Sequence, residues 1–125
     1  QQEAVYDDLL VELQTYFYHR LAELSREGVL DIILDPGFGF AKTIAHNFTL
    51  LKNLSQFQQL QRPILAGISR KPMIWKSLKI RPEDALNGTS ALHMLALEQG
   101  ANMLRVHDVR EAVECINLHR LYVNG

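Results

Sequence analysis

The sequence predicts an α/β protein whose parallel strands and helices form about half of a TIM (β/α)8 barrel. Three short apolar runs, at residues 30–34, 64–68 and 101–106, are separated by segments whose apolar residues recur every three or four positions. Such alternation is typical of parallel strands joined by helical crossovers. A full barrel takes about 250 residues, and this chain has 125. We therefore expect residues 1–125 to form half of one barrel domain.

Helices are expected wherever apolar side chains return to one face of a 3.6-residue turn. The first covers residues 4–27 and ends at Gly28, where a glycine can adopt the left-handed conformation. Residues 87–90 are predicted to form a turn followed by a helix cap, and Asp108 to cap the final helix. The other predicted helices cover about 48–60, 72–78, 81–86, 91–99 and 109–122.

Composition excludes several classes of protein. The formal net charge is −1, whereas a nucleic-acid-binding domain normally carries a basic face, so no nucleic-acid partner is expected. No apolar run approaches the roughly 18–20 residues that span a bilayer. Cys115 is the single cysteine, which excludes an internal disulfide and suits a reducing compartment. We expect a cytoplasmic protein without a membrane segment.

The start of the chain is also informative. Residues 1–3 contain no basic segment followed by an apolar one, so no signal peptide is predicted. There is no initiator methionine, and the sequence opens inside an apparent helix. We expect the chain to be a piece of a larger protein.

The most informative stretch is residues 29–40, where an apolar run ends in Asp35 and then a glycine-rich loop. The run has the β-branched character of a strand buried on both faces. Pro36 cannot donate to a strand ladder, and Gly37 and Gly39 allow a bound molecule to approach the backbone. Ligands in α/β proteins bind at this carboxyl end of the strands. The alternative is an ordinary turn that Asp35 caps.

Each predicted strand delivers polar residues to this same edge. The second is followed by Ser69, Arg70 and Lys71, and the third by Arg105 and His107. A carboxylate can accept two N–H groups from a heterocycle, and a lysine can donate to a ring carbonyl and nitrogen. An arginine beside a histidine suits a phosphate or pyrophosphate. Alternatively, Lys71 begins a solvated helix and His107 is structural, although a cation at a helix start opposes the dipole.

Together these stretches resemble the dihydropteroate synthase family of pterin-binding barrel enzymes. The likeness runs from about residue 28 to the end, so the chain would be the carboxy-terminal half of the barrel. The matching segments occur in the family's order, at residues 35–40 with Lys42 and Asn47, at 67–71, at 87–89 and at 105–109.

The resemblance implies a transferase of folate biosynthesis. In that reaction p-aminobenzoate displaces pyrophosphate from hydroxymethyl-dihydropterin diphosphate. The resemblance assigns the aspartate at Asp35 to the pterin amino and ring N–H groups, and the lysine at Lys71 to the ring carbonyl and N5. It adds Phe40 and Gly67 to the pterin site.

The pyrophosphate site follows from the same resemblance. Arg105 and His107 would hold the leaving group, and with Lys71 they form the implied catalytic set. Mg2+ is implied as the cofactor that helps to neutralise the diphosphate. No metal ligand is expected in this chain, because the family's Mg2+-binding asparagine lies in the amino-terminal half.

The resemblance places p-aminobenzoate near Ser69, Arg70 and position 72. The family usually has serine where this chain has Pro72, which lacks both the hydroxyl and the amide N–H. The carboxylate of p-aminobenzoate would then rely on other amides at the helix start. Sulfonamide drugs, which imitate p-aminobenzoate, are implied as inhibitors.

Two other functions are compatible with the sequence. A pterin-binding methyltransferase domain would share the pterin carboxylate, but it need not carry both residues 69–71 and 105–107. A non-catalytic half-barrel would survive by self-association through its open strand edges. For the same reason we expect a homodimer.

Overall fold

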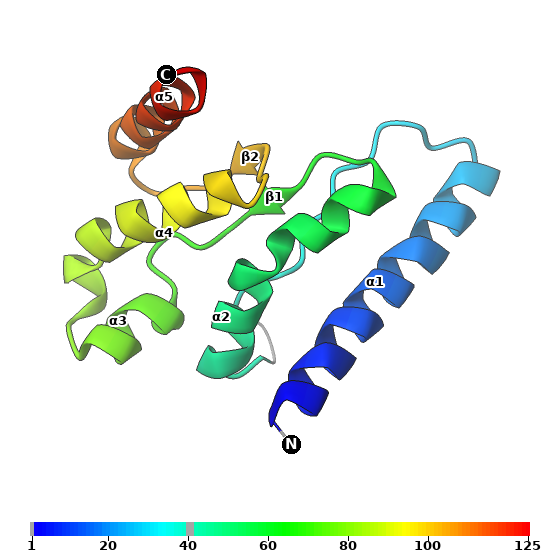
Figure 1. The fold of residues 1–125 in the computed structure, drawn as a ribbon, viewed down its shortest axis with the longest axis horizontal. Coiled ribbons are helices and arrows are strands. Elements are labelled where there is room, and N and C mark those ends of the chain that lie inside the picture. Colours follow the sequence, from blue (N-terminus) through cyan, green and yellow to red (C-terminus); the bar gives the residue numbers. More distant parts are fainter. Residues whose placement is uncertain (1, 40–41) are drawn as a thin grey trace.

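The computed structural model describes residues 2–39 and 42–125, with side chains from residue 8 onward. Figure 1 shows the long helix α1 beside α2 at one side of the molecule, and α4 and α5 at the other. The elements are, in chain order, α1 (Gln2–Arg26), α2 (Ile44–Lys52), the 3-10 helix η1 (Leu54–Leu60), β1 (Leu65–Ala66), α3 (Pro72–Leu78), the 3-10 helix η2 (Pro82–Asp84), α4 (Leu86–Glu98), β2 (Met103–Leu104) and α5 (Val109–Asn124).

The strands are short and parallel, as the alternation predicts. β1 pairs with β2 in parallel, with Leu65 opposite Met103. On the other side of β1, Leu34 forms a parallel bridge to Ile64. Of the strand predicted at residues 30–34, only this bridge at Leu34 forms. Leu34, β1 and β2 lie in chain order across one surface, and their carboxyl ends point to the same end of it.

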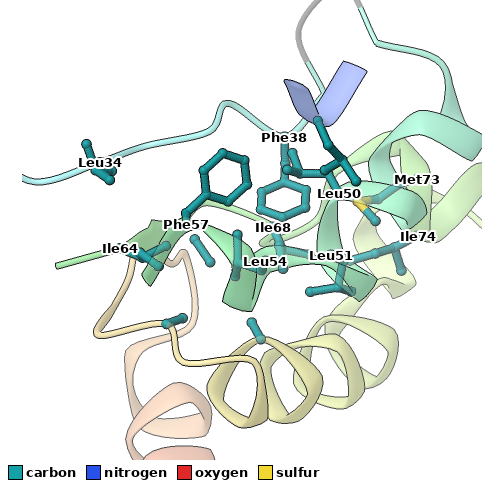
Figure 2. Packing of buried hydrophobic residues seen from close by; sticks show 14 of the residues in the cluster. Leu34, Phe38, Leu50, Leu51, Leu54, Phe57, Ile64, Ile68, Met73 and Ile74 are labelled. Atoms are coloured by element: carbon teal, nitrogen blue, oxygen red, sulfur yellow. The ribbon is translucent and has the colours of Figure 1, made fainter. Parts of the chain in front are cut away.

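The core lies where α2 and η1 pack against the strand residues. Figure 2 shows Phe57 and Phe38 at its centre, with Leu34 and Ile64 on the strand side. Ile64, Ala66 and Ile68 are all fully buried. Their spacing of two places the intervening residues, including Gly67, on the opposite side of the strand. That opposite side carries the candidate site.

The prediction that the first strand is buried on both faces is wrong for this chain. Leu34 is 2% exposed, but Leu30 is 79% exposed and Ile33 is 47% exposed. In the described part of the chain, Leu34 is bridged on one side, to Ile64, and no partner is paired on its other side. Without a second neighbour, the preceding apolar residues stay exposed.

The helix predicted over 48–60 is two helices. α2 begins at Ile44, where the Thr43 hydroxyl accepts the backbone N–H of His46 at 3.0 Å. It ends at Lys52, and the side-chain amide of the next residue, Asn53, donates back to the Thr49 carbonyl at 2.8 Å. Asparagine competes with the helix ladder in this way, and η1 continues from Leu54.

The turn predicted at residues 87–90 lies inside α4, which begins at Leu86. A Cβ on Gly88 would lie 2.6 Å from Ile74 Cγ2. Thr89 is buried and accepts the Arg70 backbone N–H at 3.0 Å. These contacts with α3 and the preceding loop place a glycine and a threonine in the helix, against their usual preference for turns.

The final helix differs from prediction in its start and in its apolar face. Asp108 is the residue before α5, but its side chain makes no capping hydrogen bond. Ala112 and Cys115 are buried, whereas the predicted apolar positions Val113 and Leu121 are exposed. Within the described residues, no helix combines the length and apolar character needed to cross a membrane.

Candidate functional site

The loop after the first strand is held by side chains from outside it. Its carbonyls at Pro36 and Gly37 accept the Lys42 ammonium at 3.1 and 2.9 Å. The Gly39 N–H donates to the Asn47 side chain at 2.8 Å. Asp35 accepts the Gly37 N–H through Oδ1 at 3.0 Å, which leaves Oδ2 for a partner across the strand edge.

That partner comes from the end of β2. Arg105 Nη1 donates to Asp35 Oδ2 at 3.2 Å. The ion pair is open to solvent, with side-chain exposures of 54% for Arg105 and 35% for Asp35. Exposed pairs of this kind contribute about 0–1 kcal/mol, so opening it to admit a ligand costs little.

Two glycines make room for the cations of the site. A Cβ on Gly67 would lie 2.5 Å from Arg105 Nη2, so the guanidinium rests against the bare backbone of β1's end. A Cβ on Gly39 would lie 3.3 Å from Lys71 Cδ, and Gly39 has φ +92°, which disfavours other residues. The flat surface beside Gly67 is the feature that lets Arg105 cross to Asp35.

Lys71 reaches the same place from the start of α3. Its ammonium donates to the Phe38 carbonyl at 3.1 Å. Burial lowers the pKa of Lys71, the Arg105 guanidinium lowers it further, and Asp35 opposes both. Burial also lowers the pKa of Lys42, against the attraction of Asp35. Asp35, Lys71 and Arg105 therefore form one coupled cluster, which we call the strand-end cluster.

Beside this cluster, two pairs of hydrogen-bonded residues connect the loop after β1 to the loop after β2. Ser69 Oγ lies 2.8 Å from His107 Nδ1 and accepts the His107 backbone N–H at 3.2 Å. Arg70 donates through Nε and Nη2 to both Asp108 oxygens, at 3.0 and 3.1 Å. This hydrogen bonding lowers the pKa of Asp108 below 3.8.

The structure brings most of the predicted site residues together, although not all into one group. The strand-end cluster, with Gly67, brings together residues that were predicted for the pterin and pyrophosphate sites, and their roles in binding stay predictions. Ser69 contacts His107, while Arg70 turns away to Asp108. Phe40 lies outside the described residues. Pro72 occupies the first turn of α3, as the sequence predicts.

The prediction that Asp108 caps the last helix is wrong, because its carboxylate is engaged by Arg70. Sequence reasoning also gave no role to Lys42, which holds the loop carbonyls. A lysine directly after a glycine-rich loop was the available signal, since its ammonium can satisfy several unpaired carbonyls.

The site residues present do not form a metal site of their own. Across the side chains of residues 8–39 and 42–125, no group of three His, Cys, Asp or Glu is arranged to hold a metal ion. Asp35, the carboxylate of the strand-end cluster, is paired with Arg105.

The family comparison identifies a match over most of the chain. The model of the family described as "Pterin binding enzyme" matches residues 1–107. The dihydropteroate synthase of Escherichia coli K12 is 40% identical over 120 residues, which are 94% of this chain and 43% of that protein. The bifunctional dihydropteroate synthase/dihydropteroate reductase of Helicobacter pylori is 41% identical over 120 residues, covering 96% of this chain and 32% of that protein. The chain thus spans less than half the length of either relative.

Solved structures of dihydropteroate synthases have a fold similar to that of this chain. The Yersinia pestis dihydropteroate synthase superposes with a TM-score of 0.90 at 35% identity, over 94% of this chain and 56% of that one. A structure of the same enzyme with a sulfonamide drug complex gives 0.91 at 36% identity, over 95% and 44%. The Coxiella burnetii enzyme in complex with pteroic acid gives 0.88 at 34% identity, over 91% and 43%.

Proposed function

Because the chain belongs to the pterin binding enzyme family, we propose that it carries the pterin- and diphosphate-binding side of a dihydropteroate synthase. The observation that carries the proposal is the strand-end cluster, in which Asp35, Lys71 and Arg105 converge from three different strand ends. The relatives named dihydropteroate synthase support this reading. The sulfonamide drug complex of the Yersinia pestis enzyme supports the proposal that sulfonamides bind here as well.

On the pterin side, Asp35 Oδ2 is the acceptor that would receive the amino and ring N–H groups of the heterocycle. In the present structure Arg105 occupies that oxygen, and a pterin would replace it. Lys71, beside Gly39, would then donate to the ring carbonyl and N5. Hydrogen bonds to a charged group contribute about 1.5–3 kcal/mol each, which is enough to orient the ring.

On the diphosphate side, Arg105 and His107 would bind the leaving group. The bond between the pterin methylene carbon and the diphosphate oxygen breaks, and its electron pair departs with pyrophosphate. The aniline nitrogen of p-aminobenzoate forms the new bond to that carbon and loses a proton. Arg105 is released from Asp35 when the pterin binds, so its charge becomes available to the departing pyrophosphate.

The p-aminobenzoate site near Ser69, Arg70 and Pro72 stays a prediction. The side chains of Ser69 and Arg70 are already engaged with His107 and Asp108. We therefore assign the carboxylate of p-aminobenzoate to backbone amides at the start of α3 rather than to the Arg70 guanidinium.

The remaining parts of the site would come from outside this chain. We propose that residues 1–125 supply about half of a (β/α)8 barrel, a view supported by the parallel strand order and by the 43% share of the E. coli relative that they match. A Mg2+ ligand would lie in the complementary half, and we derive no step through the metal. The homodimer and the cytoplasmic location stay predictions.

The two alternative functions would need different site residues. A pterin-binding methyltransferase would need the pterin carboxylate but not the Arg105–Asp35 arrangement. A self-associating half-barrel would need neither. The joint presence of Ser69 with His107 and of Arg105 with Asp35 favours the synthase.

The test uses the natural polypeptide that carries these residues, at its full length. Incubation with hydroxymethyl-dihydropterin diphosphate and p-aminobenzoate should release pyrophosphate and form dihydropteroate. Asp35→Asn should abolish most of this activity, whereas Asp31→Asn, on an exposed neighbour, should not. Loss of the pterin diphosphate without incorporation of p-aminobenzoate would refute the proposal.

A further inference from the structure

Two adjacent hydrogen-bonded residue pairs connect the loops that follow β1 and β2. Ser69 contacts His107, and the next residue, Arg70, contacts Asp108, the residue after His107. All three guanidinium nitrogens of Arg70 donate hydrogen bonds, because Nη1 also donates to the Pro82 and Glu83 carbonyls at 3.2 and 2.9 Å. The Ser69–His107 contact is therefore held in register by its neighbours.

The hydrogen bonds at Ser69 determine which ring nitrogen of His107 carries a proton. A serine hydroxyl has one hydrogen and can accept two hydrogen bonds. Oγ accepts the His107 backbone N–H at 3.2 Å, a group that can only donate. The second contact, at 2.8 Å, is with Nδ1 of the same histidine.

The hydroxyl hydrogen needs an acceptor because Ser69 is only 3% exposed. Among the described residues, Nδ1 is the acceptor that lies within hydrogen-bond distance of it. If Nδ1 carried the proton instead, both Ser69 contacts would donate to Oγ, and the buried hydroxyl hydrogen would be left unpaired. That arrangement costs about 1–3 kcal/mol.

We propose that Ser69 is a positioning residue that fixes His107 in the Nε2–H tautomer, so that His107 presents an N–H donor on the side away from Ser69. The tautomer follows from the contacts alone. Its use, donation to a phosphate oxygen beside Arg105, rests on the proposed function. Ser69 would then serve the diphosphate through His107 and need not touch p-aminobenzoate.

The tautomer can be read directly by NMR. The natural full-length polypeptide, labelled with 15N-histidine, is measured above the ordinary histidine pKa of about 6.5. His107 should show a protonated Nε2 and an unprotonated Nδ1 that accepts a hydrogen bond. A proton on Nδ1 would overturn the proposal. This reading needs no substitution, so it stands even if variants fold poorly.

Substitution then tests Ser69. In Ser69→Ala, the ring loses the hydroxyl that holds Nδ1, so it should populate both neutral tautomers, and the His107 Nδ1 resonance should shift toward that of a partly protonated nitrogen. Ser77→Ala, the same change at an exposed position in α3, should leave it unchanged. An unaltered Nδ1 resonance in Ser69→Ala would show that Ser69 does not set the tautomer.

Calorimetry with inorganic pyrophosphate tests the consequence. Loss of the ordered donor should weaken binding by about threefold to tenfold in Ser69→Ala, with no change in Ser77→Ala. Equal affinity in Ser69→Ala and wild type would overturn the role in anion binding. If wild type shows the predicted tautomer but binds no pyrophosphate, the proposed function fails and the tautomer assignment stands.

Discussion

Among single residues, the glycine at position 67, which has no side chain, is as important to the site as the charged residues. Arg105 crosses from the end of β2 to Asp35 over Gly67, whose backbone leaves no space for a Cβ. Ala66 and Ile68, on either side of Gly67, are fully buried in the core. One strand thus supplies both the core packing and the bare surface on which the guanidinium lies.

Gly67→Ala should therefore displace Arg105 with little effect on folding. The new Cβ would lie 2.5 Å from Nη2, and the guanidinium can move because it is half exposed. We expect the melting temperature to change little and the pyrophosphate affinity to fall by at least about threefold. In an Arg105→Ala background, Gly67→Ala should have no further effect. Additive losses would contradict this account.

The buried imidazole of His93 should make the stability of the protein depend on pH. It is 2% exposed and its Nε2 has no hydrogen-bond partner among the described residues. Burial lowers its pKa from 6.5, against the attraction of Asp108. As pH falls below 6.5, the unfolded chain binds a proton before the folded one does. The contribution to the free energy of unfolding is therefore complete above pH 6.5 and decreases as pH falls.

Urea unfolding of the full-length polypeptide across this pH range checks the point. His93→Gln should flatten the decrease in unfolding free energy below pH 6.5. His19→Gln, at an exposed position in α1, serves as the matched control. Equal slopes for His93→Gln and wild type would mean that burial of His93 does not govern this part of the curve.

At the scale of elements, α4 shows how tertiary contacts outweigh local preference. Its first turns contain Asn87 and Gly88, residues that favour turns, yet they are helical because Gly88 lies against Ile74 of α3. The neighbouring Thr89 ties the same turn to Arg70. This end of α4 thereby supports the loop that carries Ser69 and Lys71.

Gly88→Ala should destabilise the protein even though alanine is the better helix former. The propensity gain is about 1 kcal/mol, whereas crowding against Ile74 costs about 1–3 kcal/mol. Asn87→Ala, at an exposed position in the same turn, gains propensity without a clash and should be neutral or stabilising. Chemical denaturation of both variants measures the difference. If Gly88→Ala were more stable than wild type, Ile74 of α3 would have to move aside at little energetic cost.

The convergence of Asp35, Lys71 and Arg105 was predictable because parallel strands deliver their carboxyl ends to one edge. The α3 start at Pro72 was predictable from the fixed φ of proline. The partner of Asp108 was not, because Arg70 lies 38 residues away and the local pattern favours a cap. The break at Asn53 was missed for a local reason, since its side chain competes for a helix carbonyl.

In the molecule as a whole, apolar residues are exposed at both edges of the sheet. Leu30 and Ile33 are exposed before the Leu34 bridge, and Met103 of β2 is 44% exposed. In the half-barrel that we propose, further strands would cover these positions. The match to 43% of the E. coli relative agrees with this picture.

Residues 1–125 expressed alone should therefore self-associate. Sedimentation over a range of concentrations should show dimers or larger species, and Ile33→Lys should reduce association by placing a charge on the open edge. A monomer that unfolds in one sharp transition independent of concentration would contradict the half-barrel account.

We propose that the strand-end cluster serves two parts of one ligand, with Lys71 on the pterin ring and Arg105 on the diphosphate. Calorimetry of the full-length polypeptide with a pterin, its diphosphate and inorganic pyrophosphate tests this most directly. Arg105→Ala should weaken pyrophosphate and the pterin diphosphate but leave the unphosphorylated pterin nearly as before. Lys71→Ala should chiefly weaken the pterin. Identical ligand profiles for the two variants would contradict the claim.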